Sequence, residues 1–339
     1  MDRDKLGSIV ANEQTQAFHD RAFVFDSLTI PYIVNEPYTE RVLKAGVNAT
    51  ILTTASEQDW DETLRRTETT LEAIEKHPLL CQATTVSEIE AAQSERKLAI
   101  MLGTQGSFML GDDISRLDIL FRLGIRSFGL AYTGPTLFAD GCGERRDAGV
   151  SFLGEELIEH VNTLPMMLDL SHCGHRTRRE GADAARAPIN THSNSYAVFA
   201  SDRNTKDETL TKIAEKGGMN GVVFHPVFVK RPKSTLEDVL DHVDHICELI
   251  GWENVGFGTD YLDYYQDNEI QVNPRWHELR PDMFAGIGNY FGLMYPDGLE
   301  NIRLLPNFTQ GLFDRGYSEQ QVTGILGGNW LRTVRNLVG

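Results

Sequence analysis

Short apolar runs alternate with amphipathic segments along this chain as far as about residue 260. The apolar runs have the length and the bounds of strands, and the amphipathic segments place apolar residues at helical spacing. This alternation is typical of a parallel sheet with crossover helices. The predicted strands are Phe23–Leu28, Val47–Thr54, Leu98–Gly103, Ser127–Tyr132, Met166–His172, Pro188–His192, Asn220–His225 and Val255–Asp260. The predicted helices are Asp61–Lys76, Ser87–Ser94, Asp113–Leu123, Gly154–Asn162, Lys206–Lys216 and Leu236–Ile250.

Eight strands with interleaved helices favour an α/β fold of the (β/α)8 TIM-barrel type over an open doubly wound sheet. No GxGxxG motif follows the first strand, and the glycines of LGTQGSF lack the spacing and the lysine of a phosphate-binding loop. The segment Asn301–Gly339 predicts two closing helices, the second beginning at Ser318. No repeat or linker interrupts the pattern, so we expect one domain over residues 1–339 with extra C-terminal helices.

The net charge and the cysteine pattern indicate which kinds of molecule the protein binds. The 339 residues carry a formal charge of −17, spread along the chain, which disfavours binding to nucleic acid or to anionic membranes. The N-terminus lacks the basic start and apolar core of a signal peptide, and the four cysteines form no CxxC pair. We therefore expect a cytoplasmic protein with free thiols that acts on a small-molecule substrate.

Candidate chemistry lies where the predicted strands end. In a barrel of this type the C-terminal strand ends line the mouth that carries the active site. Three histidines at consecutive strand ends favour a metal site or a proton relay, whereas one histidine alone would be an ordinary core or surface residue. An aspartate there has a site role or caps a turn. The strand-end residues are Gln105, Tyr132, His172, His192, His225 and Asp260.

Four stretches carry a family resemblance that covers nearly the whole chain: MLDLSHCG, APINTHSNSYAVFASDRNTKDETL, NVGFGTDY and GLFDRGYSEQQVTGILGGNWLRTV. They resemble the membrane dipeptidase (renal dipeptidase) family of metallopeptidases, within the amidohydrolase-like metallo-dependent hydrolase barrels. The resemblance implies a homodimeric (β/α)8 barrel that holds two zinc ions and hydrolyses dipeptides. It implies metal binding by His172 and His192, a grip of Arg203 on the substrate carboxylate, and a place for Asp260 near the substrate amine and the reacting water.

The chain departs from this family at the other ligand positions. Leu28 and Ile30 stand where the family has a metal-binding His-x-Asp pair, Gln105 where it has the metal-bridging glutamate, and Tyr132 where it has a substrate-facing histidine. Two neighbouring divalent ions need an anionic bridge, which an amide cannot supply. We therefore expect at most one zinc or other divalent metal, on His172 and His192 with Asp260 or His225 as third ligand, or none.

Three functions remain open on the sequence. The first is a divergent hydrolase of an amide or peptide C–N bond, with Asp260 as base and Arg203 holding a carboxylate. The second is a lyase or isomerase that uses acid–base chemistry with one metal or none. In that case His172, His192, Asp260 and Tyr132 move protons, Gln105 donates to an oxyanion, and Leu28, Ile30 and His225 line a pocket for a less polar, even aromatic, substrate. The third is a non-catalytic binding protein.

The long segment after the last predicted strand is rich in aromatic residues. Tyr261, Tyr264, Tyr265 and Trp276 lie in it, together with two prolines. A long aromatic loop at a barrel mouth is typical of a lid or a subunit contact, and the same residues could serve only in packing.

Overall fold

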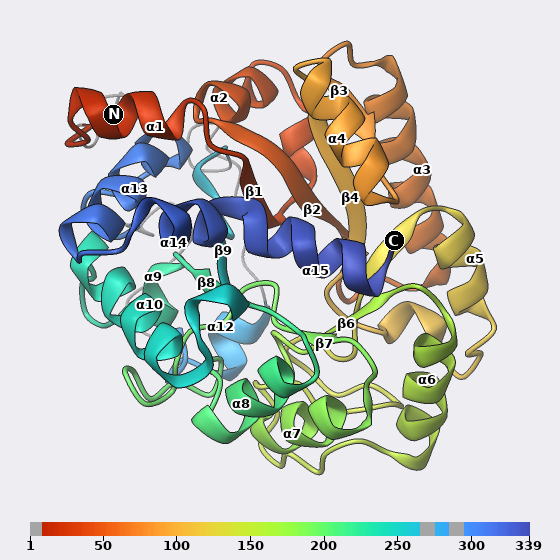
Figure 1. Ribbon diagram of the computed structural model, residues 1–339. Coiled ribbons are helices and arrows are strands. Elements are labelled where there is room, and N and C mark those ends of the chain that lie inside the picture. Colours follow the sequence, from red (N-terminus) through yellow and green to blue (C-terminus); the bar gives the residue numbers. More distant parts are fainter. Residues whose placement is uncertain (1–8, 265–274, 285–294) are drawn as a thin grey trace.

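The protein forms a nearly closed barrel of parallel strands surrounded by helices (Figure 1), as predicted. The computed structural model describes residues 9–264, 275–284 and 295–339. Around the barrel the strands follow the order β7-β6-β5-β4-β2-β1-β9-β8, and a parallel bridge between Asn190 and Asn220 brings the two ends of this order together. The strands are β1 Val24–Thr29, β2 Val47–Ala55, β3 Leu80–Gln82, β4 Leu98–Thr104, β5 Ile125–Gly129, β6 Met167–Asp169, β7 Pro188–Ile189, β8 Asn220–Val223 and β9 Val255–Gly258.

All eight predicted strands exist, but five of them end earlier than the apolar pattern indicated. The second half of the barrel is built from strands of two to five residues, β5 to β9. The residues predicted at their tips therefore lie in the loops that follow. The strand β3 was not predicted; it is short and pairs with the beginning of β4, while β5 pairs with the end of β4.

Helices cover the outside of the sheet (Figure 1). The predicted helix Leu236–Ile250 has the same bounds in the structure, where Thr235 and Asp238 form a capping box at its start. The α-helices are α1 Glu13–His19, α2 Tyr38–Lys44, α3 Trp60–Lys76, α4 Val86–Ser94, α5 Arg116–Arg122, α6 Phe152–Thr163, α7 His175–Ala184, α8 Asp207–Glu215, α9 Pro226–Val229, α10 Leu236–Ile250, α12 Arg275–Leu279, α13 Leu305–Asp314, α14 Glu319–Thr323 and α15 Asn329–Leu337.

The C-terminal helices close one end of the barrel. A π-helical turn, Gly324–Gly328, joins α14 to α15, so the predicted closing helix runs on from the Ser318 N-cap, which shares a capping box with Gln321. Figure 1 shows α15 crossing the end of the barrel. From it Trp330 packs on Phe25 of β1, with ring centroids 6.1 Å apart. This end is the floor of the barrel, so the site lies at the opposite end.

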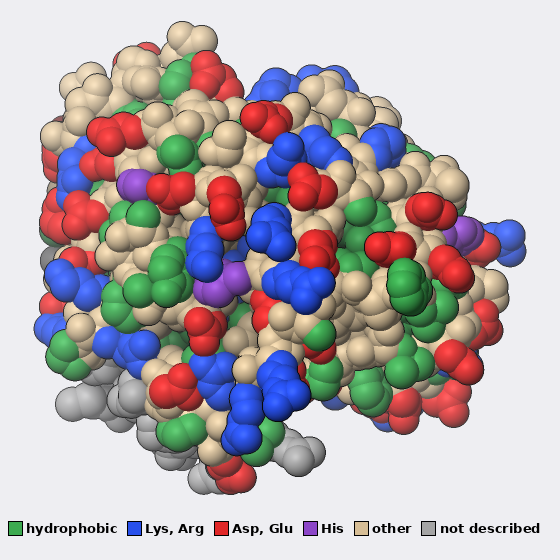
Figure 2. All heavy atoms as spheres, turned by 90° about the horizontal axis from the view of Figure 1, so that it is seen from below, with side chains coloured by type: hydrophobic (Ala, Val, Ile, Leu, Met, Phe, Trp, Pro, Cys, Tyr) green, Lys and Arg blue, Asp and Glu red, His purple; other side chains and the backbone are tan. Residues whose placement is uncertain are grey.

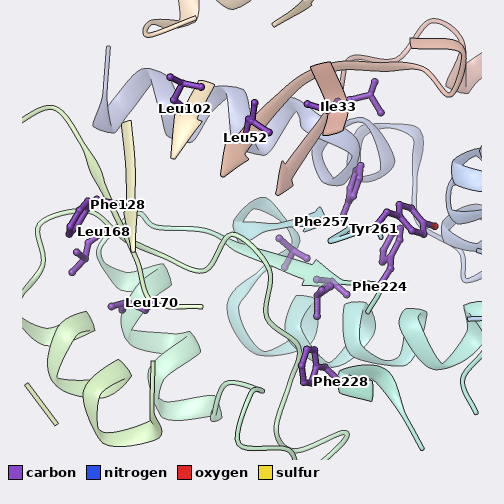
Figure 3. Packing of buried hydrophobic residues seen from close by; sticks show 14 of the residues in the cluster. Ile33, Leu52, Leu102, Phe128, Leu168, Leu170, Phe224, Phe228, Phe257 and Tyr261 are labelled. Atoms are coloured by element: carbon purple, nitrogen blue, oxygen red, sulfur yellow. The ribbon is translucent and has the colours of Figure 1, made fainter. Parts of the chain in front are cut away.

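The core has two parts. The larger one lies between sheet and helices; Figure 3 shows part of it, where Phe224 stacks on Phe257 with centroids 5.7 Å apart. The smaller one takes Phe25, Ile51 and Met101 from neighbouring strands and includes Trp330. Among the helices that the structure describes, none combines the length and the apolar character that crossing a bilayer requires.

Candidate active site

A small cavity of about 40 Å³ lies at the mouth, among the loops that follow β5 to β9. Five predicted site residues meet around it: Tyr132, His172, Arg203, His225 and Asp260. Their convergence follows from the barrel, because the C-terminal ends of its strands share one rim. The remaining lining residues are Thr133, Cys142, Phe228, Trp276, Met283 and Phe284.

His172 and His192 form a buried imidazole pair. Their Nε2 atoms are 3.0 Å apart, and the ring of Tyr132 lies 4.2 Å from that of His172 between centroids. Burial, and next the positive charge of Arg203, hold the pKa of both histidines well below its usual range. At neutral pH both rings are therefore neutral and can accept as well as donate protons.

Arg203 is a buried cation with unused donors. Its side chain is 1% exposed, its Nη1 donates to the carbonyl of Ser171, and its guanidinium lies over the ring of Phe228. Its Nε and Nη2 are buried and have no hydrogen-bond partner in the described part of the chain. Unpaired charged donors in a protein interior are costly, so this group is suited to an anion that enters the cavity.

Asp260 faces the same cavity from the loop after β9. Its backbone has a φ of 51°, in the left-handed region, and its N–H donates to the carbonyl of Leu28. Burial raises the pKa of its carboxyl to about 7, the charge of Arg203 opposes this shift, and Asp26 adds to it. A carboxyl that titrates near neutrality is suited to general acid–base chemistry.

Gln105, Leu28 and Ile30 are not among the described residues that line this cavity. Gln105 and Leu28 are buried, and Leu28 belongs to neither of the two hydrophobic clusters. Ile30 packs against the larger cluster and begins the 3-10 turn Pro31–Val34. The proposed roles of these three residues in oxyanion or substrate binding remain predictions.

Part of the long segment after β9 covers the cavity. Trp276, Met283 and Phe284 line it, and Arg280 fixes their segment by donating to Asp202 and to the carbonyls of Cys142 and Gly143. Tyr261 and Tyr264 serve in packing: Tyr261 is buried and donates to the Leu299 carbonyl, and Tyr264 stacks on Tyr32. Tyr265 lies outside the described residues.

Two buried aspartates beneath the site were not predicted from the sequence. Asp169 accepts from Ser171 and Thr191, and Asp26 accepts from Thr259. A signal was available, because an aspartate interrupts the apolar run in both VFDSL and MLDLSH. By contrast, Cys173 is a buried free thiol, and burial raises its pKa to about 12, which disfavours the nucleophilic thiolate.

A match to the sequence pattern of a known protein family, over most of the chain, identifies the family. The family described as "Membrane dipeptidase" matches residues 39–268 and 283–338. The chain belongs to the membrane dipeptidase family. An uncharacterized dipeptidase of Schizosaccharomyces pombe is 31% identical over 253 residues, which are 72% of this chain and 54% of that protein. The chain thus spans about half the length of the curated relatives that it matches.

Solved structures share the fold of this family member. An amidohydrolase from Pseudomonas aeruginosa is 26% identical and has a TM-score of 0.86. The match covers 96% of this chain and 99% of that one. A metallopeptidase from Rhodobacter sphaeroides, solved with a phosphinate mimic of the dipeptide L-Ala-D-Ala, is 19% identical with a TM-score of 0.78. The match covers 94% of this chain and 99% of that one, and at this identity it shows the fold alone.

The residues present do not fit the two-metal centre that the family implies. Within residues 9–264, 275–284 and 295–339, no three His, Cys, Asp or Glu side chains are grouped so that they could hold a metal ion. The pair of His172 and His192 supplies two neutral nitrogens, whereas protein zinc sites use three or four ligands and a bridged pair of ions needs negative charge. We therefore derive no catalytic step through a metal.

Proposed function

We propose that this member of the dipeptidase family hydrolyses an amide or peptide C–N bond in a small substrate that carries a carboxylate. The observation that carries the proposal is Arg203, whose buried Nε and Nη2 lack partners at the wall of the cavity. A carboxylate would accept from both donors and neutralise the buried charge. Family membership supports a hydrolase, since the curated relatives are named as dipeptidases.

In this proposal Asp260 is the general base. The ionised carboxylate removes a proton from the attacking water, and the resulting acid returns a proton to the leaving nitrogen. A pKa of about 7 serves both steps near neutral pH. The neutral pair of His172 and His192 holds a proton between its Nε2 atoms beside the cavity and can accept a further proton during the reaction.

The lining residues also indicate the kind of group beside the carboxylate. Phe228, Met283 and Phe284 give the cavity apolar walls next to Arg203. Such walls favour an apolar or aromatic side chain over a charged one, because a charged group would lose its hydration there. At about 40 Å³ the cavity has room for one or two water molecules. A substrate of dipeptide size therefore requires the lining side chains or the covering segment to shift.

The test compares free acids with their amides. A panel of dipeptides and N-acyl amino acids with apolar side chains is assayed beside the corresponding C-terminal amides, with wild type, Arg203→Lys and Arg203→Met. A charge-assisted bidentate contact is worth roughly 1.5–3 kcal/mol, so Arg203→Met should lower kcat/KM for the acid by about 10- to 100-fold. The amide should lose much less. Equal losses for acid and amide would reject carboxylate binding by Arg203.

A lyase or isomerase is the second candidate. The observation in its favour is the loss of metal ligands. Leu28, Ile30 and Gln105 stand at the positions where the resemblance implies metal-binding residues in the family's hydrolases. Turnover in water enriched in ¹⁸O separates the two reactions. Hydrolysis places one labelled oxygen in the carboxylate product, whereas an isomerisation or an elimination that forms a double bond incorporates none.

A further inference from the structure

Thr191 connects a buried carboxylate to the catalytic histidine pair. Its Oγ1 lies 2.6 Å from Oδ2 of Asp169 and 2.7 Å from Nδ1 of His192. Oδ1 of Asp169 accepts from the backbone N–H groups of Ser171 and Thr191 and from the Ser171 hydroxyl. All these groups are buried. The carboxylate thus receives four hydrogen bonds, and in each of them its oxygens are the acceptors.

The direction of the hydroxyl follows from this arrangement. Thr191 has one hydroxyl proton, and its hydroxyl donates that proton to Oδ2 of Asp169. Thr191 therefore donates to Asp169, and its oxygen accepts a proton from Nδ1 of His192. Because the neutral imidazole has one N–H, the lone pair of His192 is then on Nε2.

The lone pair of His192 faces Nε2 of His172 at 3.0 Å. Two lone pairs at that distance would repel each other, so Nε2 of His172 carries the proton that lies between the rings. Nδ1 of His172 is left as an acceptor, and it is buried without a partner in the described residues. One hydroxyl thereby sets the protonation of both rings.

The same arrangement occurs a second time in the barrel. Asp26 accepts from the N–H and the hydroxyl of Thr259, at 2.9 and 2.5 Å, and from the N–H of Leu28. Thr259 directly precedes Asp260, as Thr191 directly precedes His192. In each copy a buried aspartate holds a threonine, and the next residue carries a proposed catalytic group.

We propose that Thr191, held by Asp169, is a positioning residue that fixes His192 as the Nδ1–H tautomer and so directs its Nε2 lone pair at His172. The catalytic consequence rests on the proposed function, whereas the tautomer is a property of the free protein. The two can therefore fail separately, and the tautomer can be measured before any substrate is known.

The experiment is ¹⁵N NMR of the full-length protein labelled at histidine. The His192 signals are identified as those missing from His192→Gln. In wild type, Nδ1 of His192 should have the shift of a protonated nitrogen and Nε2 that of an unprotonated one. Thr191→Val, which keeps the shape and removes the hydroxyl, should abolish this single-tautomer pattern, and Thr191→Ser should retain it.

Thr259→Val is the matched control. It removes the equivalent hydroxyl in the second copy, so any general effect of losing such a bond appears there while the His192 shifts stay as in wild type. Circular dichroism and Tm establish that each variant is folded. The proposal is overturned if wild-type His192 is protonated on Nε2, or if folded Thr191→Val has the wild-type pattern.

Once a substrate is available, kinetics give a second readout. Thr191→Val should lower kcat by about 10- to 100-fold with little change in KM, because the hydroxyl acts on the proton acceptor and not on the substrate. Thr191→Ser should restore kcat. If Thr191→Val loses the single-tautomer pattern of His192 but keeps the wild-type kcat, the catalytic role of the histidine pair is contradicted. The positioning role of Thr191 then still stands.

Discussion

The buried ionisable groups at the mouth affect each other's charge. Burial, and next the charge of Arg203, lower the pKa of His172 and His192. Burial and Asp26 raise the pKa of Asp260, and the charge of Arg203 opposes this shift. Burial also raises the pKa of Asp26 to about 7. Near neutral pH the site therefore holds one fixed positive charge and carboxyls that are poised to titrate, which suits an anionic substrate and a proton-transfer reaction.

The raised pKa of Asp260 predicts a particular pH dependence of stability. The folded protein keeps the proton up to about pH 7, whereas the unfolded chain releases it near pH 4. Between these values the folded state binds more protons, so the free energy of unfolding falls as pH rises. In Asp260→Asn this decline should be shallower, which urea denaturation at pH 4.5, 6 and 7.5 would measure.

Asp282→Asn provides a control of opposite sign. A hydrogen bond from Arg280 lowers the pKa of Asp282, so its contribution to stability is lost as pH falls. In Asp282→Asn the slope of the free energy of unfolding against pH should therefore equal that of wild type between pH 4.5 and 7.5. The two slopes should differ only at more acidic pH. If Asp260→Asn also had the wild-type slope, the raised pKa of Asp260 would be wrong.

At the scale of elements, the ends of the helix α10 were easier to predict than the ends of the later strands. The α10 helix has an apolar face, a Thr235 cap and a following glycine, so its local sequence determines both ends. The strand β6 ends at Asp169 although the apolar pattern continues, because strand pairing stops where Asp169 turns to accept backbone N–H groups. That end is set by a contact with Thr191, 22 residues away in sequence, which periodicity cannot reveal.

The helix α15 should be a major source of stability, because Trp330 plugs the floor of the barrel. Trp330 is fully buried and packs on Phe25 and Gly256, where an added Cβ would come within 2.4 Å of the indole. Trp330→Ala should lower the free energy of unfolding by about 3–5 kcal/mol. Guanidinium denaturation monitored by circular dichroism would measure this.

Trp330→Phe separates packing from hydrogen bonding at the same position. The indole N–H of Trp330 is buried without a partner in the described part of the chain, so removing it loses no hydrogen bond. Trp330→Phe should therefore cost much less than Trp330→Ala. If both variants lost the same free energy of unfolding, the contribution of Trp330 would not come from the packing of its ring.

The cover over the cavity depends on Arg280. Its bonds to Asp202 and to the Cys142 and Gly143 carbonyls join the covering segment to loops after β7 and β5. Arg280→Ala should speed amide hydrogen exchange in α12 severalfold, since local opening then breaks fewer contacts. Arg315→Ala, which removes a comparable surface network with Glu237, Asp241 and Asp244 elsewhere, should leave that exchange unchanged. Unchanged exchange in Arg280→Ala would mean that other contacts hold the cover.

At the scale of the whole molecule, charge is distributed without one dominant patch on the face that Figure 2 shows. Lys and Arg side chains gather near its middle, and acidic side chains lie among and around them. The net charge of −17 therefore does not determine the character of every surface. The positive charge that matters for the proposed substrate is Arg203, which is buried at the mouth.

Five of the eleven residues that line the cavity were predicted from the sequence, while the groups beneath them required the structure. The barrel predicts that the strand-end residues His172 and Asp260 converge, whereas Arg203 was expected there only from the family resemblance. Asp26 and Asp169 act beneath the surface of the mouth, and Phe228 and Met283 come from loops whose path no periodic pattern specifies. The repeated pairs Thr191-His192 and Thr259-Asp260 are the signal that a closer reading of the sequence could have used.

The barrel brings the ends of β1, β4, β6 and β7 to one rim, so a metal centre would need ligands from several strands at once. Restoring one ligand should therefore fail. Gln105→Glu should bind no more zinc than wild type after gel filtration, measured by elemental mass spectrometry. The combination Leu28→His, Ile30→Asp and Gln105→Glu should retain clearly more, because it adds an imidazole and two carboxylates to the pair of His172 and His192.

Stability provides the deciding control for that experiment. Placing His at Leu28, which is 1% exposed, buries a polar group and should lower Tm in the absence of metal. Zinc that binds the folded site should raise Tm of the triple variant and leave that of Gln105→Glu unchanged. If the single variant gained as much zinc and Tm as the triple one, the replacement of the first-strand ligands would not be what separates this chain from the two-metal members of its family.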